Sequence, residues 1–157
     1  MRARPSAENI DSEPTTMERN QSKKPSPIRI MLVEDNPGDV YLLEKTLQNR
    51  KMNYELIRYS DGEQAIGALQ KDECAVPDLI LLDLNLPRRE GFEVLQTIRS
   101  KPSMVGVPIG ILTSSDAAKD RHRIALTGGE RYIHKPPMLE EFLEQVGQAV
   151  EELLAGN

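Results

Sequence analysis

Residues 79–87 read Leu-Ile-Leu-Leu-Asp-Leu-Asn-Leu-Pro, and this segment carries the strongest structural signal in the chain. Four consecutive aliphatic residues that end in the carboxylate of Asp83 are typical of a parallel strand covered on both faces. Ile28–Glu34 and Ile109–Thr113 have the same nearly continuous aliphatic character. Two less regular strands are predicted at Tyr54–Tyr59 and Arg131–His134. The chain is therefore expected to contain five strands.

Amphipathic stretches follow these strands. Apolar residues recur there at helical spacing, in the groups Val40, Leu43 and Leu47; Ala65, Ile66 and Leu69; Phe92, Leu95 and Ile98; Ala117, Ile124 and Ala125; and Phe142, Val146, Ala149, Val150 and Leu153. Asp61 and Asp116 are predicted N-caps of the second and fourth helices, and Pro136-Pro137 marks the start of the fifth. Five strand–helix pairs predict an α/β fold, in which right-handed crossovers place helices on both faces of one doubly wound parallel sheet.

The length of 157 residues fits one domain with a hydrophobic core. The net charge of −5 argues against a nucleic-acid partner, because phosphate backbones are bound through clustered Lys and Arg. Cys74 is the only cysteine, so an intrachain disulfide is excluded. The chain also lacks a run of about 18 apolar residues and a secretory signal. We therefore expect a cytoplasmic protein that does not enter a membrane.

Residues 1–27 are predicted to be a disordered N-terminal tail. Four prolines lie there among Ser, Thr, Glu and Arg, and few sizeable apolar groups are available to order the segment. Residues 28–154 form one predicted domain. Only residues 155–157 follow it, so we expect no output domain in the chain.

Polar residues gather where the predicted strands end. In an open doubly wound sheet, ligands bind beyond the carboxyl ends of the strands. These ends carry Glu34-Asp35, Asp83, Thr113-Ser114 and Lys135-Pro136. Any one of these residues, taken alone, is most simply explained as a solvated loop residue. Three carboxylates, hydroxyls and an ammonium at one edge instead predict a reactive site.

The three carboxylates require a counterion. Two carboxylates about 4 Å apart at an effective dielectric of ~20 repel by roughly 4 kcal/mol, so a cluster must bind a cation or take up protons. Mg²⁺ prefers oxygen ligands and is commonly held by carboxylates together with a phosphate, with Mn²⁺ as the alternative ion. Asp35 and Asp83 suit this duty, and Glu34 would act directly or through water.

The same residues are equipped for phosphoryl transfer. Asp83 is the predicted nucleophile, and its product would be an acyl phosphate. Thr113 would donate a hydrogen bond to one phosphoryl oxygen, Lys135 would pair with a second, and the metal with the third. Each phosphoryl oxygen would then have its own partner.

Taken together, these segments resemble the receiver domain of bacterial response regulators, from about Ile28 to Leu154. The resemblance rests on four segments in the correct order and separation, namely Leu32-Val33-Glu34-Asp35-Asn36, Leu81-Leu82-Asp83-Leu84-Asn85-Leu86-Pro87 followed by Gly91, Ile111-Leu112-Thr113-Ser114-Ser115, and Tyr132-Ile133-His134-Lys135-Pro136. It implies a flavodoxin-like fold with strand order 2-1-3-4-5. It also implies phosphorylation of Asp83 by a sensor histidine kinase and signalling through phosphorylation-dependent protein contacts.

The resemblance assigns further roles. The backbone carbonyl of Asn85 would complete the metal site, and the side chains of Asn85 and Ser115 would control removal of the phosphoryl group by water. Thr113, with Ser114 beside it, would move toward the phosphoryl group while Tyr132 changes orientation. The Lys135–Pro136 peptide bond is expected to be cis, a state that proline makes accessible.

A narrower resemblance concerns Glu34-Asp35-Asn36-Pro37-Gly38-Asp39-Val40 and Leu112-Thr113-Ser114-Ser115. These runs look like those of the single-domain regulators that serve bacterial phytochromes and related hybrid kinases. The resemblance implies a kinase partner of that type. A homodimer through the fourth and fifth strands and the last helix is compatible with it, and so is a monomer. Gly110, within the fourth predicted strand, is expected to weaken packing.

Three other functions would require different residues or leave the same residues in place. A phosphatase of the haloacid dehalogenase type would need an acidic residue two positions after Asp83, where Asn85 stands. A pseudo-receiver that acts only as a scaffold would have lost an acidic position or Lys135, and both are kept. An intermediate receiver that passes its phosphoryl group to a histidine phosphotransfer protein stays open.

Overall fold

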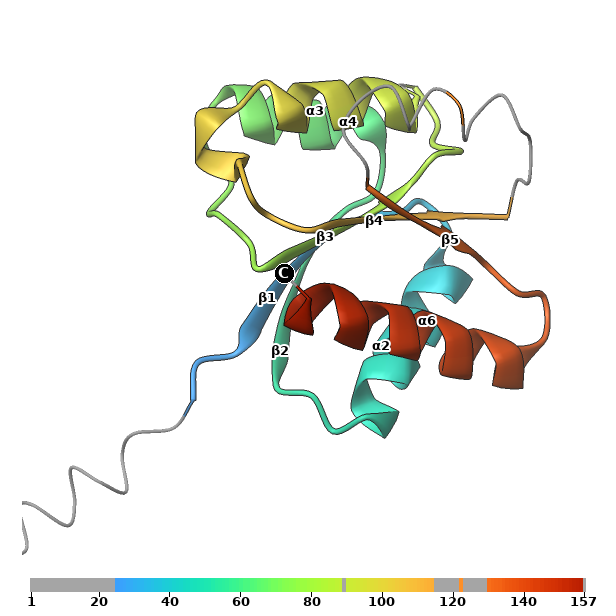
Figure 1. Cartoon of the computed structure of the whole chain (residues 1–157). Coiled ribbons are helices and arrows are strands. Elements are labelled where there is room, and N and C mark those ends of the chain that lie inside the picture. The colour runs from blue at the N-terminus through green and yellow to red at the C-terminus, as the bar shows by residue number, and fades with distance from the viewer. Residues whose placement is uncertain (1–24, 89, 115–121, 123–129, 157) are drawn as a thin grey trace, which may run out of the picture.

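The computed structural model describes residues 25–88, 90–114, 122 and 130–156, which build one parallel sheet between two layers of helices (Figure 1). The strands are β1 (Ile28–Val33), β2 (Tyr54–Tyr59), β3 (Leu79–Asp83), β4 (Ile109–Thr113) and β5 (Arg131–His134). Every neighbouring pair is parallel, and the order is β2-β1-β3-β4-β5. The predicted sheet and strand order are confirmed, with β1 ending one residue earlier than expected.

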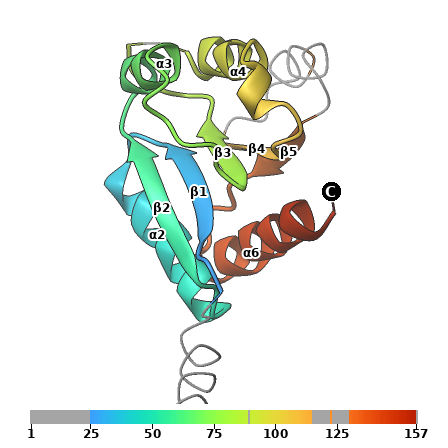
Figure 2. The same ribbon diagram turned by 90° about the vertical axis from the view of Figure 1, so that its left-hand side faces the viewer.

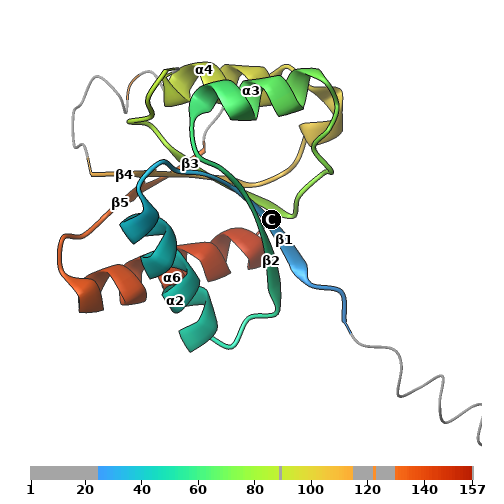
Figure 3. The ribbon, with the colours of Figure 1, turned by 180° about the vertical axis from the view of Figure 1, so that it is seen from behind.

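Four α-helices and one short 3₁₀ helix lie in the described part of the chain: α2 (Pro37–Asn49), α3 (Gly62–Gln70), α4 (Gly91–Arg99), η1 (Pro102–Met104) and α6 (Leu139–Ala155). Helices α3 and α4 cover one face of the sheet, and α2 and α6 cover the other (Figures 1 and 3). None of these helices has the length and apolar composition needed to cross a bilayer. The predicted helix with Ala117, Ile124 and Ala125, and its cap Asp116, lie outside the described residues.

The central strand β3 joins two hydrophobic layers. All five of its residues are buried, with Ile80 and Leu82 in the layer toward α3 and α4, and Leu79 and Leu81 in the layer toward α2 and α6. Figure 2 shows the sheet between these layers. Each fully buried Leu or Ile contributes about 1.5–3 kcal/mol, so the aliphatic run that precedes Asp83 fixes that residue at a rigid position.

Gly110 corrects an expectation. A Cβ atom there would lie 3.0 Å from Ile133 Cδ1, Leu153 Cδ1 and Leu81 Cδ2, which is closer than ordinary van der Waals contact. The glycine therefore lets α6 and β5 approach β4 closely, and it tightens the packing that it was expected to weaken.

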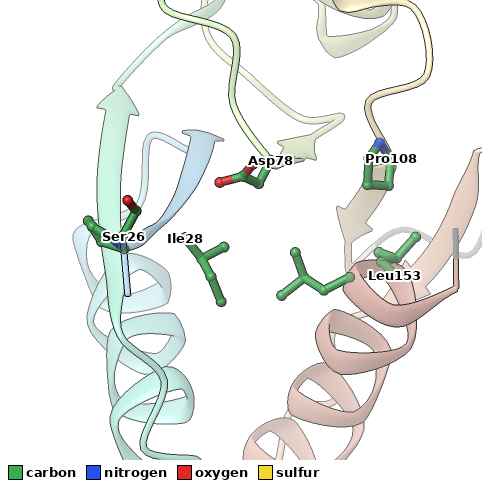
Figure 4. Close-up of a pocket in the computed structure, with 7 residues that line it drawn as sticks. Ser26, Ile28, Asp78, Pro108 and Leu153 are labelled. Carbon is green, nitrogen blue, oxygen red and sulfur yellow. The ribbon is translucent and has the colours of Figure 1, made fainter. Parts of the chain in front are cut away.

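The amino ends of the strands border a mostly apolar cavity of about 510 Å³. Ile28, Asp78, Pro108 and Leu153 border it from four different segments (Figure 4), and Ser26, Pro27 and Leu154 complete the lining. The Asp78 carboxylate accepts a hydrogen bond from the backbone N–H of Arg29 at 2.8 Å, which joins the start of β3 to β1. This end of the sheet is organised mainly by apolar packing and main-chain contacts.

Candidate functional site

Three carboxylates meet at the opposite end of the sheet. Asp83 is the last residue of β3, and Glu34 and Asp35 follow β1, whose Val33 pairs with Leu82 of β3. One carboxylate oxygen from each of Glu34, Asp35 and Asp83 lies within 4.8 Å of the other two. Glu34 and Asp83 are only 2% and 4% exposed, whereas Asp35 is exposed.

Main-chain donors orient the two buried carboxylates. The Asn85 N–H donates to Asp83 Oδ1 at 3.0 Å, and the Asn36 N–H donates to Glu34 Oε2 at 3.3 Å. In each case the donor stands two residues after the carboxylate, so the loop that leaves the strand also holds the side chain. The second oxygens, Asp83 Oδ2 and Glu34 Oε1, face Lys135.

Lys135 is the only described lysine that reaches this cluster. Its Nζ lies 2.8 Å from Glu34 Oε1, 2.8 Å from Asp39 Oδ2 and 3.5 Å from Asp83 Oδ2. Its backbone N–H donates to the carbonyl oxygen of Thr113 at 2.9 Å, which fixes the residue just beyond β5. The side chain is 9% exposed, so the ammonium is held largely away from water.

Burial and mutual contact shift both ends of this ion pair. Burial raises the pKa of Glu34 to about 7, and a hydrogen bond with Asp83 adds to the rise, while Lys135 opposes it. Burial alone would lower the pKa of Lys135, but its hydrogen bonds to Asp39 and Glu34 outweigh burial and raise it. Lys135 is therefore charged at neutral pH, and one ammonium faces more negative charge than it can neutralise. A divalent cation would relieve this imbalance.

The hydroxyl side of the site comes from β4. Thr113 is fully buried, and its Oγ1 accepts a hydrogen bond from Asn85 Nδ2 at 3.4 Å. Ser114 follows it and is exposed. Tyr132 is half-buried and packs against the hydrophobic layer toward α3 and α4. Ser115 lies outside the described residues.

Gly91 packs against the backbone of the turn that follows Asp83. A Cβ atom at this position would lie 2.4 Å from the Asp83 carbonyl oxygen and 2.6 Å from Leu84 Cα. The Gly91 N–H donates to the Leu84 carbonyl oxygen at 3.1 Å. Both contacts involve backbone atoms, so a larger residue would displace the segment that carries the Asp83 carboxylate.

Two features differ from the sequence-based expectations. The Lys135–Pro136 peptide bond is trans, so the expectation of a cis bond is wrong. The trans form is the ordinary preference of a bond before proline, by about 0.5–1 kcal/mol. Asp39 was not predicted as a site residue, yet it contacts Lys135 as closely as Glu34 does. Its place four residues after Asp35, in the first turn of α2, is the sequence signal that was available.

The sequence profile of the response regulator receiver domain matches residues 30–147. The chain belongs to this family. Response regulator Rcp1 of Synechocystis sp. is 39% identical over 95 residues, which cover 58% of this chain and 65% of Rcp1. The chain covers only 42–46% of three transcriptional regulatory proteins that it also matches.

Solved receiver structures share the fold over most of the chain. The phosphorylated cyanobacterial phytochrome response regulator RcpA matches with a TM-score of 0.75 and 32% identity, over 83% of this chain and 96% of RcpA. The Mn²⁺-bound form of Rcp1 matches at 0.74 and 32%, over 83% and 97%. The receiver domain of the Pseudomonas aeruginosa histidine kinase PA1611, with magnesium in its active site cleft, matches at 0.62 and 31%, over 79% and 97%. This receiver domain is thus related to metal-binding receivers and to phytochrome response regulators.

Proposed function

We propose that this receiver accepts a phosphoryl group on Asp83 from a sensor histidine kinase and signals through phosphorylation-dependent protein contacts. The observation that carries the proposal is the placement of Asp83. Its carboxylate is buried at the end of β3, within 4.8 Å of two other carboxylates and 3.5 Å from the Lys135 ammonium. A carboxylate poised beside a cation and a hydroxyl suits a phosphoryl acceptor.

Mg²⁺ fits the residues present, with Mn²⁺ as the alternative ion. The donors are hard oxygens, and the raised pKa of Glu34 reflects carboxylates crowded in a buried place. Asp35, Asp83 and the backbone carbonyl of Asn85 would hold the ion, with Glu34 acting directly or through water. When bound, it would neutralise charge on the phosphoryl oxygens.

The side chains around Asp83 have separate duties in this proposal. The Asn85 N–H orients the Asp83 carboxylate for attack on phosphorus, and the bond from phosphorus to the kinase histidine breaks as the new bond forms. Thr113 donates to one phosphoryl oxygen and Lys135 pairs with another. Ser114 and Tyr132 take part in the switch that follows, and Asn85 and Ser115 control the approach of water.

The kinase is proposed to be of the phytochrome type, or a related hybrid kinase. The likeness to RcpA and Rcp1 supports this choice. We also propose that the protein acts as a single-domain regulator, with a homodimer through β4, β5 and α6 as one form of assembly. Pull-down of phosphorylated protein against each sensor kinase of the source organism, followed by transfer assays, tests the pairing.

Labelling with acetyl phosphate and Mg²⁺ tests the phosphorylation itself. The wild-type chain should gain one hydroxylamine-labile phosphoryl group, measured by intact mass, and Asp83→Asn should gain none. Asp78→Asn is the matched control, because it changes the aspartate that directly precedes the same strand and should leave labelling intact. Equal labelling of the Asp83→Asn variant would overturn the assignment.

A further inference from the structure

The Lys135 ammonium has a partner for each of its donors. An ammonium offers three N–H bonds, and three carboxylates surround this one: Glu34 and Asp39 at 2.8 Å and Asp83 at 3.5 Å. The lysine is therefore held more closely by Glu34, which follows β1, and by Asp39 of α2 than by the residue that would accept the phosphoryl group. A close contact with a phosphoryl oxygen on Asp83 would draw the Lys135 ammonium toward Asp83 and away from its two closer partners.

The first turn of α2 is built so that Asp39 meets Lys135. Asn36 caps the helix, and its side chain accepts a hydrogen bond from the Gly38 N–H at 2.8 Å. Pro37 occupies the first helical position, where its fixed φ suits the helix. A Cβ atom on Gly38 would lie 3.1 Å from Asn36 Oδ1, so glycine leaves room for the cap. These three residues set the direction from which Asp39 approaches the lysine.

The two close partners differ in burial, and this difference shows which one can release the lysine. Glu34 is 2% exposed, so losing its cation would leave a buried charge without compensation. The Asp39 side chain is 26% exposed and can exchange the ammonium for water. Its position in the first turn of α2 also lets the helix dipole stabilise its charge.

We propose that Asp39 is a positioning residue that holds Lys135 back in the unphosphorylated protein and releases it when Asp83 carries a phosphoryl group. A phosphoryl group brings more negative charge and more acceptor oxygens than the carboxylate it modifies, so it outcompetes the more exposed of the two partners. This inference rests on the proposed function. It adds that the start of α2 loses an ionic contact on phosphorylation, and it thereby couples this helix to the state of Asp83.

The first experiment measures binding of beryllofluoride, a phosphoryl mimic, with Mg²⁺ present. Asp39→Asn should bind it about tenfold more tightly, because Lys135 no longer has to break a charge-assisted hydrogen bond. Glu63→Gln is the matched control, since it removes a carboxylate from the first turn of α3 and should change the affinity by less than about twofold. Unchanged affinity of Asp39→Asn would overturn the inference.

A double-mutant cycle separates positioning from simple charge repulsion. If Asp39 acts through the lysine, Asp39→Asn should change beryllofluoride binding by less than about twofold in a Lys135→Met background. The same tenfold gain in both backgrounds would mean that Asp39 only repels the anion, and would overturn the proposal. Asp39→Glu keeps a carboxylate and should bind beryllofluoride like the wild type. This control shows whether the effect of Asp39→Asn comes from the lost charge or from a disturbed α2.

The ¹⁵N signal of the Lys135 ammonium gives a readout that needs no phosphoryl mimic. Without beryllofluoride, Asp39→Asn should already move this signal toward its position in the beryllofluoride-bound wild type, whereas Asp39→Glu should not. Failure of the wild type to bind beryllofluoride would defeat the proposed function and this inference together. Binding by the wild type, with an unmoved lysine signal in Asp39→Asn, would defeat only the inference.

Discussion

The amino and carboxyl ends of the sheet differ in how much charge they bury. At the amino end, Asp78 is exposed and accepts a backbone N–H, beside a cavity lined mainly by apolar residues. At the carboxyl end, Asp83 is 4% exposed and shares its surroundings with two carboxylates and an ammonium. Buried charge is costly unless it is paired. The carboxyl end, with its buried charges, therefore contributes little to the free energy of folding. The hydrophobic layers on the two faces of the sheet must supply the stability that this end lacks.

The largest expected effect on stability comes from replacing Gly91, which packs against the backbone of Asp83. Gly91→Val would place side-chain atoms against the backbone of Asp83 and Leu84, and we expect the free energy of unfolding to fall by about 3 kcal/mol. Gly67→Ala is the control, because an added Cβ on Gly67 in α3 meets no atom within 4 Å and should raise stability by about 0.5–1 kcal/mol. Urea unfolding measures both, and equal stability of the two variants would contradict the close packing behind the site.

Removing the charge of Lys135 should lower the free energy of unfolding. Lys135→Met leaves buried carboxylates without a cation, and we expect a loss of about 3 kcal/mol that added Mg²⁺ partly restores. Lys101 pairs with the exposed Asp72, so Lys101→Met should cost about 1 kcal/mol and respond little to Mg²⁺. Thermal unfolding with and without Mg²⁺ tests both variants. Similar Mg²⁺ responses would contradict the difference between the ends.

The amino end should affect folding without affecting chemistry. Leu153 is partly buried, lines the cavity and packs in the layer toward α2 and α6. Leu153→Ala should lower the free energy of unfolding by about 2 kcal/mol. The rate of labelling by acetyl phosphate should not change at a temperature where the variant is folded. A reduced rate there would mean that the two ends are coupled.

The smallest effect concerns pH. Because the pKa of Glu34 is raised to about 7 from 4.5, its stabilising contribution to the metal-free fold is complete below pH 4.5 and is lost as pH rises toward 7. Mg²⁺ needs the deprotonated carboxylate, so its affinity should rise about fivefold over the pH unit below 7 and level off about one unit above 7. Titration of Mg²⁺ by calorimetry tests this, and Glu34→Gln should show a flatter profile.

The sequence was sufficient for the sheet because each strand has a local signature. The aliphatic run before Asp83 is typical of a strand covered on both faces, and the last residue of such a strand lies at the carboxyl edge of the sheet. The same logic placed Glu34, Thr113 and Lys135 at that edge. The position of each of these residues is predictable because each one ends or directly follows a recognisable strand.

Contacts that depend on three-dimensional distance were not predictable in this way. Asp39 stands 96 residues from Lys135, and an acidic residue in a first helical turn is already explained by the helix dipole. Gly110 was expected to weaken the packing because the sequence does not show which side chains lie over it. Its neighbours Leu81, Ile133 and Leu153 come from three other elements. The trans bond before Pro136 shows that a family resemblance does not determine the isomer in this chain.

The close packing over Gly110 also has a mechanical consequence for α6. Leu153 lies near the end of this helix and over the space left by the missing Cβ of Gly110, so sliding along the axis would move its side chain off that space. The helix can still swing about that point. Leu139 stands at the other end, roughly 21 Å away at 1.5 Å per residue, so a swing of about 3° would carry it about 1 Å. Movement in α6 should therefore be largest beside Lys135 and smallest beside the amino end of the sheet.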